Sequence, residues 1–262
     1  MNPDEFERRM RAGECFHALK IPPGTWAVLR LDGRGFSRLT EARFDKPFDL
    51  RFHELMCEAA RALVIDLGAL YAFTESDEIS VLMPRGSTLF DREVEKLVSV
   101  SASIASSTFS LGLEAAAHFD SRVWVGARPE DVADYFRWRQ SDAGRCCLNG
   151  WAYWTLRKAG RTVSEATGQL HRSTVAEKNE LLFQHGINFN DLPSWQKRGT
   201  GWRWESHEKP GANPKTGEQV SVVRRRLAVD RDLPLGDAYG RFIMELLESD
   251  GSANTAPTRS GR

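Results

Sequence analysis

Two acidic positions have the residue type and the setting that metal-assisted phosphoryl transfer requires. Asp32 directly follows the short apolar run 26–31, and Asp77 lies in a polar connection between two further apolar runs. Carboxylate oxygens on rigid strand ends suit Mg²⁺, which keeps several waters and completes its shell with substrate phosphates. Two such ions about 3.5–4 Å apart can clamp the attacking and leaving oxygens of a phosphoryl displacement. Gly33 lets the backbone approach closely, so its carbonyl is a third candidate ligand.

Each carboxylate also has an ordinary structural explanation. Asp-Gly is a common turn pair, and Ser-Asp-Glu is a common hairpin tip. A metal site is favoured only if the fold brings Asp32 and Asp77 to neighbouring strand ends.

The elements that must position these residues follow from the periodicity of apolar residues. Strands are predicted at 26–31, 69–73, 79–83, 115–119 and 123–125, and helices at about 48–66 and 90–109. The order strand, helix, strand, strand, helix, strand is the split β-α-β arrangement of a ferredoxin-like domain. The first strand and the hairpin lie side by side in such a sheet. Asp32 and Asp77 should therefore meet at one edge.

Beyond Pro129 the chain becomes helical and aromatic. A further helix is predicted over 174–184, and residues 201–229 read as a second hairpin. The segment after Glu248 is small and polar, which favours disorder. We therefore predict an α/β protein in three parts: a catalytic domain (1–130), a helical and β-hairpin extension (131–247) and a disordered tail (248–262).

Composition limits the classes of partner. Among the 262 residues, 36 Lys and Arg balance 36 Asp and Glu, so any binding to RNA must use local basic patches. There is no apolar run of about eighteen residues, and no membrane span is expected. The charged start does not resemble a secretory signal, and the four cysteines lack zinc-site spacing. We expect a reducing, cytoplasmic location.

Basic residues surround the two acidic motifs. Arg34, Arg38 and Lys46 follow the first motif, and Arg92 and Lys96 lie four apart on the predicted second helix. Residues four apart share a helix face, so this pair could contact triphosphate oxygens. The alternative is that the two side chains lie on a solvated helix face and bind nothing.

Seven motifs in order resemble the tRNA-His guanylyltransferase family over about residues 25–200. They are LRLDGRGFSRLT (29–40), FDKPFD (44–49), ESDEIS (75–80), the spacing of Arg92, Lys96 and Ser99, HFDSRV (118–123), DYFRWRQSDA (134–143) and AEKNELLFQHGINFND (176–191).

The resemblance implies a ferredoxin-like polymerase palm that works in the reverse, 3′–5′ direction. In this family a nucleoside triphosphate, ATP or GTP, activates the 5′-monophosphate of a tRNA. The 3′-hydroxyl of an incoming nucleotide then attacks the activated phosphate. Two Mg²⁺ ions would be held by Asp32, the Gly33 carbonyl and Asp77. Relatives assemble as tetramers, so a homotetramer is implied as well.

The same resemblance assigns roles to further residues. Those expected to wrap the nucleotide triphosphate are Asp32, Gly33, Arg34, Gly35, Phe36 and Ser37, with Ser76 and Asp77 nearby. Those expected to contact phosphates or the tRNA 5′ end are Lys46, Arg92, Lys96, Ser99 and Arg122. Glu78 adjoins the site and is counted with Asp32 and Asp77 as a catalytic carboxylate.

One segment departs from the pattern of the enzymes that mature tRNA-His. Those enzymes follow the W-R-Q-x-D stretch with His-Ile-Asn-Asn-Leu-Tyr-Asn, whereas this chain has GRCCLNG at 144–150 and lacks most of that heptad. The departure favours the branch that rebuilds truncated 5′ ends on the opposite strand of the acceptor stem. Two alternatives remain open: a cyclase-like palm enzyme acting on free nucleoside triphosphates, and a non-catalytic tRNA-binding protein.

Overall fold

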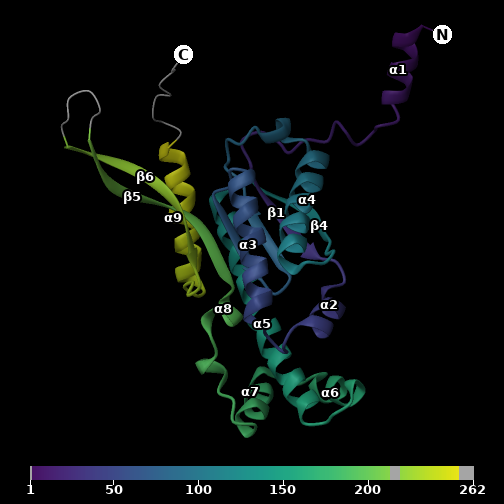
Figure 1. Ribbon diagram of the computed structural model, residues 1–262, viewed down its shortest axis with the longest axis vertical. Helices are drawn as coiled ribbons and strands as arrows, with labels where there is room; N and C mark the ends of the chain where they lie inside the picture. The colour runs from purple at the N-terminus through teal and green to yellow at the C-terminus, as the bar shows by residue number, and fades with distance from the viewer. Residues whose placement is uncertain (1, 213–218, 254–262) are drawn as a thin grey trace.

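The computed structural model describes residues 2–212 and 219–253, which share one six-stranded antiparallel sheet (Figure 1). The strand order is β4-β1-β3-β2-β5-β6. The strands are β1 (Trp26–Gly33), β2 (Tyr71–Glu75), β3 (Glu78–Leu82), β4 (Phe119–Gly126), β5 (Thr200–Ala212) and β6 (Gln219–Asp230). Strands β1 to β4 with α3 and α4 give the predicted split β-α-β order, which is confirmed, although the strands predicted at 115–119 and 123–125 form one strand, β4.

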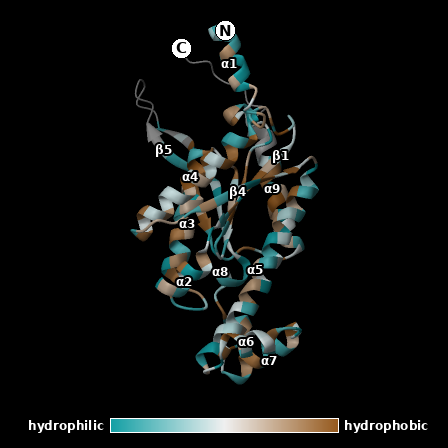
Figure 2. Cartoon of the chain, turned by 90° about the vertical axis from the view of Figure 1, so that its right-hand side faces the viewer, coloured by the Kyte–Doolittle hydropathy of each residue, from teal (hydrophilic) through white to brown (hydrophobic). Residues whose placement is uncertain are grey.

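Helices cover both faces of the sheet. On one face lie α3 (Leu50–Asp66) and α4 (Val94–Leu113), and on the other lie α5 (Pro129–Lys158) and α9 (Asp237–Ala253) (Figures 1 and 2). Alternate residues of β1 point to opposite faces of the sheet. Leu29 packs in the core beneath α3 and α4, and Val28 packs in the core beneath α5 and α9. A strand buried on both faces reads as a continuous apolar run, which is why β1 was visible in the sequence.

The remaining elements are short. They are α1 (Pro3–Arg11), α2 (Phe36–Arg43), α6 (Val163–Leu170), α7 (Val175–Gln184), α8 (Ser194–Arg198) and the 3₁₀ turns η1 (Leu89–Arg92) and η2 (Phe189–Asp191). Helix α5 extends past the sheet to a small lobe formed by α6 and α7 (Figure 1). Both lobe helices begin with a capping box, at Thr162 and Thr174, which satisfies the backbone N–H groups of the N-cap and of the third helical residue.

The connection between β2 and β3 is tighter than predicted. The sequence predicted a five-residue link, but Glu75 pairs with Glu78, so the turn contains only Ser76 and Asp77. Ser76 has φ +50°, a left-handed conformation that non-glycine residues adopt in tight turns. Apolar periodicity missed the strand ends because their side chains are buried yet polar.

The predicted second helix begins later than expected. Helix α4 starts at Val94, and Arg92 belongs to η1, where Phe90, Asp91 and Arg92 all have positive φ. Arg92 and Lys96 therefore do not share a helix face, and that prediction is wrong. The Arg92 guanidinium instead donates hydrogen bonds to five backbone carbonyls, those of Ile21, Pro22, Thr25, Arg85 and Ser87.

Replacing Arg92 with methionine should lower the stability of the fold by about 2–3 kcal/mol. A hydrogen bond to a charged group is worth about 1.5–3 kcal/mol, and because Arg92 is only half-buried, water can replace most of the five bonds that the variant loses. Urea unfolding measures the effect. Lys96→Met, an exposed change on α4, is the control and should leave the midpoint unchanged. Equal midpoints for both variants would contradict the structural role of Arg92.

Two predictions about the C-terminal part have different outcomes. The hairpin at 201–229 is confirmed as β5 and β6, and β5 pairs with β2, so the predicted extension continues the sheet of the predicted catalytic domain. The tail predicted from residue 248 is helical as far as Ala253, and its remainder (254–262) lies outside the described residues. Within the described ranges, no helix has the length and apolar character needed to cross a membrane.

Candidate active site

The two predicted carboxylates meet at one end of the sheet. Strands β1 and β3 are antiparallel neighbours in which Asp32 lies opposite Glu78. The Gly33 N–H donates to the Asp77 carbonyl at 3.0 Å, so the loop after β1 lies against the β2–β3 turn. The prediction that Asp32 and Asp77 come together is confirmed: Asp32 lies near the end of β1, and Asp77 lies in the turn that joins β2 to β3.

Negative charge accumulates at this position. Burial, followed by repulsion from Asp32, raises the pKa of Asp77 above its usual value. A cation placed between the two carboxylates would relieve that repulsion, so the residues present fit a divalent ion with oxygen ligands. The described residues contain no cluster of three or more His, Cys, Asp or Glu side chains that could hold a metal. Main-chain oxygen, water and substrate phosphates would have to complete the shell, as Mg²⁺ prefers.

The loop that follows Asp32 is closely packed. A Cβ on Gly33 would lie 2.4 Å from the ring of Phe36, which is itself buried against Phe109 and Phe119. Gly35 adopts φ +74° where it caps α2. The Arg34 N–H donates to the His118 carbonyl at 2.8 Å. The segment 32–37 is therefore a rigid turn in which backbone groups can come close to a bound phosphate.

A cavity of about 400 Å³ opens beside Asp77. Its polar wall includes Ser37, Lys46, Ser76 and Asp77, four of the residues predicted to bind nucleotide. Its aromatic wall contains Phe44, Phe48, Tyr153, Trp154 and Trp195, contributed by the segment before α3, by α5 and by α8. This volume lies in the range of small-molecule sites, and the combination of acidic, basic and aromatic groups suits a nucleotide.

Lys46 is placed to meet negative charge in the cavity. Its ammonium lies 5.7 Å from the centre of the Trp154 ring and contacts the Thr40 hydroxyl. Partial burial lowers the pKa of Lys46, while Glu41 and Asp77 act in the opposite direction. The Lys158 ammonium donates to the Lys46 carbonyl at 2.6 Å and holds this segment against α5. Lys46 can therefore neutralise a phosphate near Asp77.

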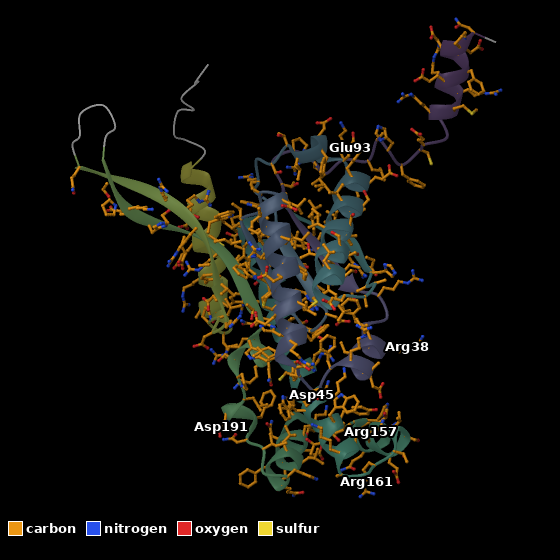
Figure 3. All side chains as sticks on the ribbon, viewed as in Figure 1. Arg38, Asp45, Glu93, Arg157, Arg161 and Asp191 are labelled. Carbon is orange, nitrogen blue, oxygen red and sulfur yellow. The ribbon has the colours of Figure 1, made fainter. Side chains whose placement is uncertain are left out.

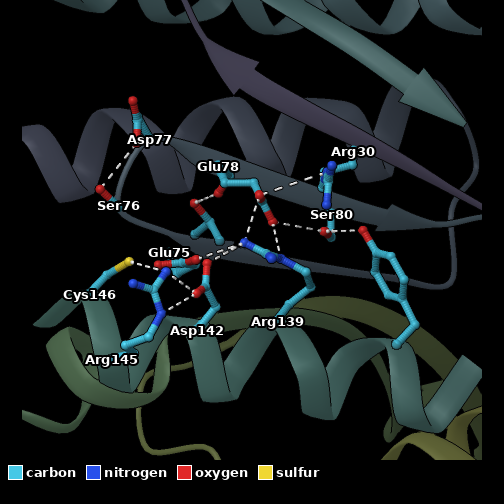
Figure 4. A network of polar contacts seen from close by, with 12 residues as sticks. Arg30, Glu75, Ser76, Asp77, Glu78, Ser80, Arg139, Asp142, Arg145 and Cys146 are labelled. Atoms are coloured by element: carbon cyan, nitrogen blue, oxygen red, sulfur yellow. Dashed lines mark hydrogen bonds and ion pairs between the residues drawn. The ribbon is translucent and has the colours of Figure 1, made fainter. Parts of the chain in front are cut away.

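A buried ion network lies between the turn and α5 (Figure 4). Arg139 donates to both oxygens of Glu78, at 2.7 and 2.8 Å, and to Glu75 at 3.3 Å. Burial raises the pKa of Glu78, and burial with repulsion from Glu78 raises the pKa of Glu75 to about 8. Figure 4 shows the Asp77 carboxylate pointing away from Arg139 while Glu78 points toward it. The predicted catalytic role of Glu78 stays a prediction, in a setting different from that of Asp77.

The predicted phosphate contacts divide into two groups. Arg122 lies on β4 opposite Arg30, near the carboxylates, and pairs with Asp120 at 2.9 Å. Arg92 instead contacts Thr25, at the start of β1, and the length of that strand puts it roughly 20 Å from Asp32. In Figure 3 its neighbour Glu93 lies well apart from Arg38 and Asp45, toward the side from which α1 projects. Within one chain, Arg92 therefore does not join the site.

Lys96 and Ser99 lie on the exposed side of α4. The Ser99 hydroxyl donates to the Glu95 carbonyl of its own helix at 2.7 Å. Neither residue lines the cavity beside Asp77. The spacing that linked them to the carboxylates in the sequence is not matched by proximity within this chain.

The segment that departs from the tRNA-His pattern lies on the cavity wall. Cys146, Cys147 and Gly150 face the cavity from α5, followed by Tyr153 and Trp154. Burial raises the pKa of Cys146 to about 11 and of Cys147 to about 12, so both are neutral thiols at neutral pH. On this wall the chain thus has small side chains at positions where the heptad of the tRNA-His enzymes would place larger polar ones.

Sequence reasoning missed the aromatic part of the site. The aromatic run of α5 has the helical spacing typical of a core, yet Trp138 is 53% exposed and Tyr153 and Trp154 line the cavity. The available signal was the helical spacing of 143, 146, 147, 150, 153 and 154, which puts them all on one face. Arg139 was visible only as part of a motif, because its partners are distant in sequence.

Comparisons with known proteins agree with this geometry. The family model described as tRNAHis guanylyltransferase matches residues 7–127, and the one described as Thg1 C terminal domain matches residues 130–231. The tRNA(His) guanylyltransferase of Debaryomyces hansenii is 36% identical over 86% of this chain and 93% of its own length. That of Schizosaccharomyces pombe is 34% identical over 81% of this chain and 89% of its own length.

Solved structures of similar fold contain nucleotides. A bacterial tRNA(His) guanylyltransferase-like protein in complex with ATP has a TM-score of 0.75 and 27% identity, over 92% of this chain and 98% of that one. A bacterial tRNA(His) guanylyltransferase-like protein in complex with GTP has a TM-score of 0.70 and 28% identity, over 93% of this chain and 99% of that one.

Proposed function

This chain belongs to the tRNA-His guanylyltransferase family, and on that premise we propose that it adds nucleotides to the 5′ end of a tRNA in the 3′–5′ direction. The observation that carries the proposal is the proximity of Asp32 to Asp77, which itself lines a cavity that can hold a nucleotide. The bound ATP and GTP of the similar structures support nucleoside triphosphates as its substrates.

We propose Mg²⁺, as two ions, for the carboxylate pair. Asp32, the Gly33 carbonyl and Asp77 would hold the metal, which when bound supplies neutralisation of charge on phosphoryl oxygens. Lys46 and the hydroxyls of Ser37 and Ser76 would orient the triphosphate from the cavity wall. The aromatic wall would hold the base and exclude water around it.

The reaction consists of two phosphoryl displacements. An oxygen of the tRNA 5′-monophosphate attacks the α-phosphorus of ATP or GTP, and pyrophosphate leaves. The 3′-hydroxyl of the incoming nucleotide then attacks the activated 5′ phosphorus, and the nucleoside monophosphate leaves. The protein supplies position and charge for both steps, since neither needs a covalent bond to a side chain.

We propose repair of truncated 5′ ends as the form of the reaction. The support is the segment 144–150, which faces the cavity with Cys146 and Gly150 in place of the polar heptad. A wall of small side chains leaves the choice of nucleotide to pairing with the opposite strand of the acceptor stem.

Further parts of the proposal concern partners and location. Exposed basic residues on β6, including Arg224 and Arg226, are candidates for contacts to the tRNA backbone. We propose the homotetramer of the family, and membership of that family is its support. The four free cysteines support a reducing, cytoplasmic location.

The reaction can be tested with two tRNAs in parallel. The protein is incubated with Mg²⁺, ATP, all nucleoside triphosphates and a 5′-monophosphorylated tRNA that lacks its first nucleotide, or with a full-length tRNA-His transcript. We expect extension of the truncated tRNA by the nucleotide complementary to the opposite strand.

Other outcomes separate the alternatives. Guanosine addition to the tRNA-His transcript alone would establish maturation in place of repair. A product that forms from triphosphates without any tRNA would establish the cyclase-like reaction. Binding of tRNA with no nucleotide incorporated would establish a non-catalytic binding protein.

A further inference from the structure

The turn that carries Asp77 contains an internal electrostatic conflict. Glu75 and Glu78 are direct cross-strand partners on either side of Ser76 and Asp77, and each is only 8% exposed. When both carboxyls are ionised, like charges directly opposite each other on neighbouring strands destabilise the pairing, and this repulsion contributes to the raised pKa of Glu75. Without a compensating cation, the two legs of this turn would tend to separate, and the carboxylate of Asp77 would move with them.

Arg139 supplies that cation from α5. Its side chain is 7% exposed, and its Nε and Nη2 donate to the two oxygens of Glu78 as a fork. The same Nη2 reaches Glu75 at 3.3 Å and Asp142 at 3.1 Å. The guanidinium lies 4.6 Å from the centre of the Trp138 ring, which limits its freedom to rotate. One planar group therefore joins both legs of the turn to one helix (Figure 4).

We propose that Arg139 is a positioning residue that holds the β2–β3 turn closed and thereby sets the place of the Asp77 carboxylate relative to Asp32. The inference deepens the proposed function, because it concerns the geometry of the same metal and nucleotide site. Arg139 bonds to the two flanking glutamates and to Asp142, and not to Asp77. It acts on the reaction only through the turn.

Arg139 and Asp77 lie in different parts of the chain. Asp77 lies in the part matched by the tRNAHis guanylyltransferase model, whereas Arg139 lies in the part matched by the Thg1 C terminal domain model. The catalytic turn of the first part is therefore held by a side chain of the second. The first part alone would keep both carboxylates but lose the group that sets their separation.

The role requires a forked donor, which makes it testable. Lysine keeps the charge but is a point donor and cannot hold two carboxylates in a plane. Methionine removes both the charge and the forked donor while keeping a side chain of similar length. Arg137→Met is the matched control, because Arg137 is an exposed residue of the same helix that pairs with Asp134 and Asp237 and does not reach the turn.

We would measure three quantities on the full chain: amide hydrogen exchange of the segment 71–82 without metal, the affinity for Mn²⁺ as a probe ion, and the rate of nucleotide addition. We expect Arg139→Lys and Arg139→Met to exchange faster in this segment alone. Their affinity for Mn²⁺ should fall about 10- to 100-fold, the size of effect seen when a group that orients a metal ligand is lost. Their rate should fall about 10²-fold, as a displacement near 1 Å predicts. Arg137→Met should match the wild type in all three.

A triple variant separates position from stability. Arg139→Met combined with Glu75→Gln and Glu78→Gln removes the unpaired buried charges that Arg139→Met alone would leave. We expect its Tm to return toward that of the wild type while the affinity for Mn²⁺ stays low. Unchanged exchange and Mn²⁺ affinity in Arg139→Lys and the triple variant would overturn the inference. A wild type that adds no nucleotide but shows these differences would defeat the proposed function and leave the inference standing.

Discussion

Asp77→Asn should lower the rate of nucleotide addition by at least about 10³-fold. A bound metal contributes several kcal/mol of transition-state stabilisation, and every 1.36 kcal/mol is about a factor of ten in rate. Asparagine keeps the size of the side chain but removes the charge that faces Asp32. Primer-extension gels with a truncated tRNA and excess Mg²⁺ measure the loss.

The same substitution should not weaken the fold in the absence of metal. The pKa of Asp77 is raised in the folded state, mainly by burial and then by Asp32, so the folded protein holds this proton more tightly than the unfolded chain. Above the pKa of the unfolded chain, ionisation of Asp77 therefore destabilises the fold. Removing the charge should leave the Tm at pH 7 equal to or above that of the wild type.

A control and a contrary result complete this test. Asp134→Asn makes the same chemical change at an exposed position of α5 that pairs with Arg137, away from the turn. It should have the activity and Tm of the wild type. Normal activity in Asp77→Asn would exclude Asp77 as a ligand. A large fall in both the Tm and the activity of Asp77→Asn would show that Asp77 supports the fold instead.

The elements that sequence predicted correctly are those specified locally. The run 26–31 is apolar on both sides because β1 lies between two helical layers, so its end at Asp32 was clear. The helical spacing in 48–66 identified α3, although Asp49 caps the helix and Leu50 begins it. Once this order of elements is recognised, topology alone places Asp32 beside the hairpin. The meeting of the two carboxylates was therefore readable from the sequence.

The parts that were missed depend on residues far apart in the chain. Arg139 is separated from Glu78 by 61 positions and from Glu75 by 64, so no local period records their contact. Arg92 has the spacing of a helical residue, but carbonyls about 70 positions earlier in the chain hold it in a left-handed turn. The aromatic residues of α5 have the periodicity of a core face. Only the packing of α3 and α8 around them shows that part of this face borders a cavity.

Glu75→Gln should make the protein more stable at pH 8 than the wild type. Burial and repulsion from Glu78 raise the pKa of Glu75 from 4.5 to about 8. The folded state thus binds this proton where the unfolded chain has released it, and stability falls as the pH rises from about 4.5 to about 8. The loss is at most about 5 kcal/mol. Glutamine cannot ionise, so the variant should avoid most of this loss at pH 8 and little of it at pH 5.

The difference between the two proteins isolates Glu75 from the other groups that titrate in this range. Burial lowers the pKa of His53 to about 4, so His53 adds stability as the pH rises toward 6.5, opposite in sign to Glu75. That contribution is common to both proteins and cancels when urea unfolding curves are subtracted at each pH, with metal removed. Glu177→Gln is the control of opposite sign, because backbone hydrogen bonds in its capping box lower the pKa of Glu177. This variant should be less stable than the wild type at neutral pH. A stability difference for Glu75→Gln that does not change between pH 5 and pH 8 would mean that Arg139 keeps Glu75 ionised throughout.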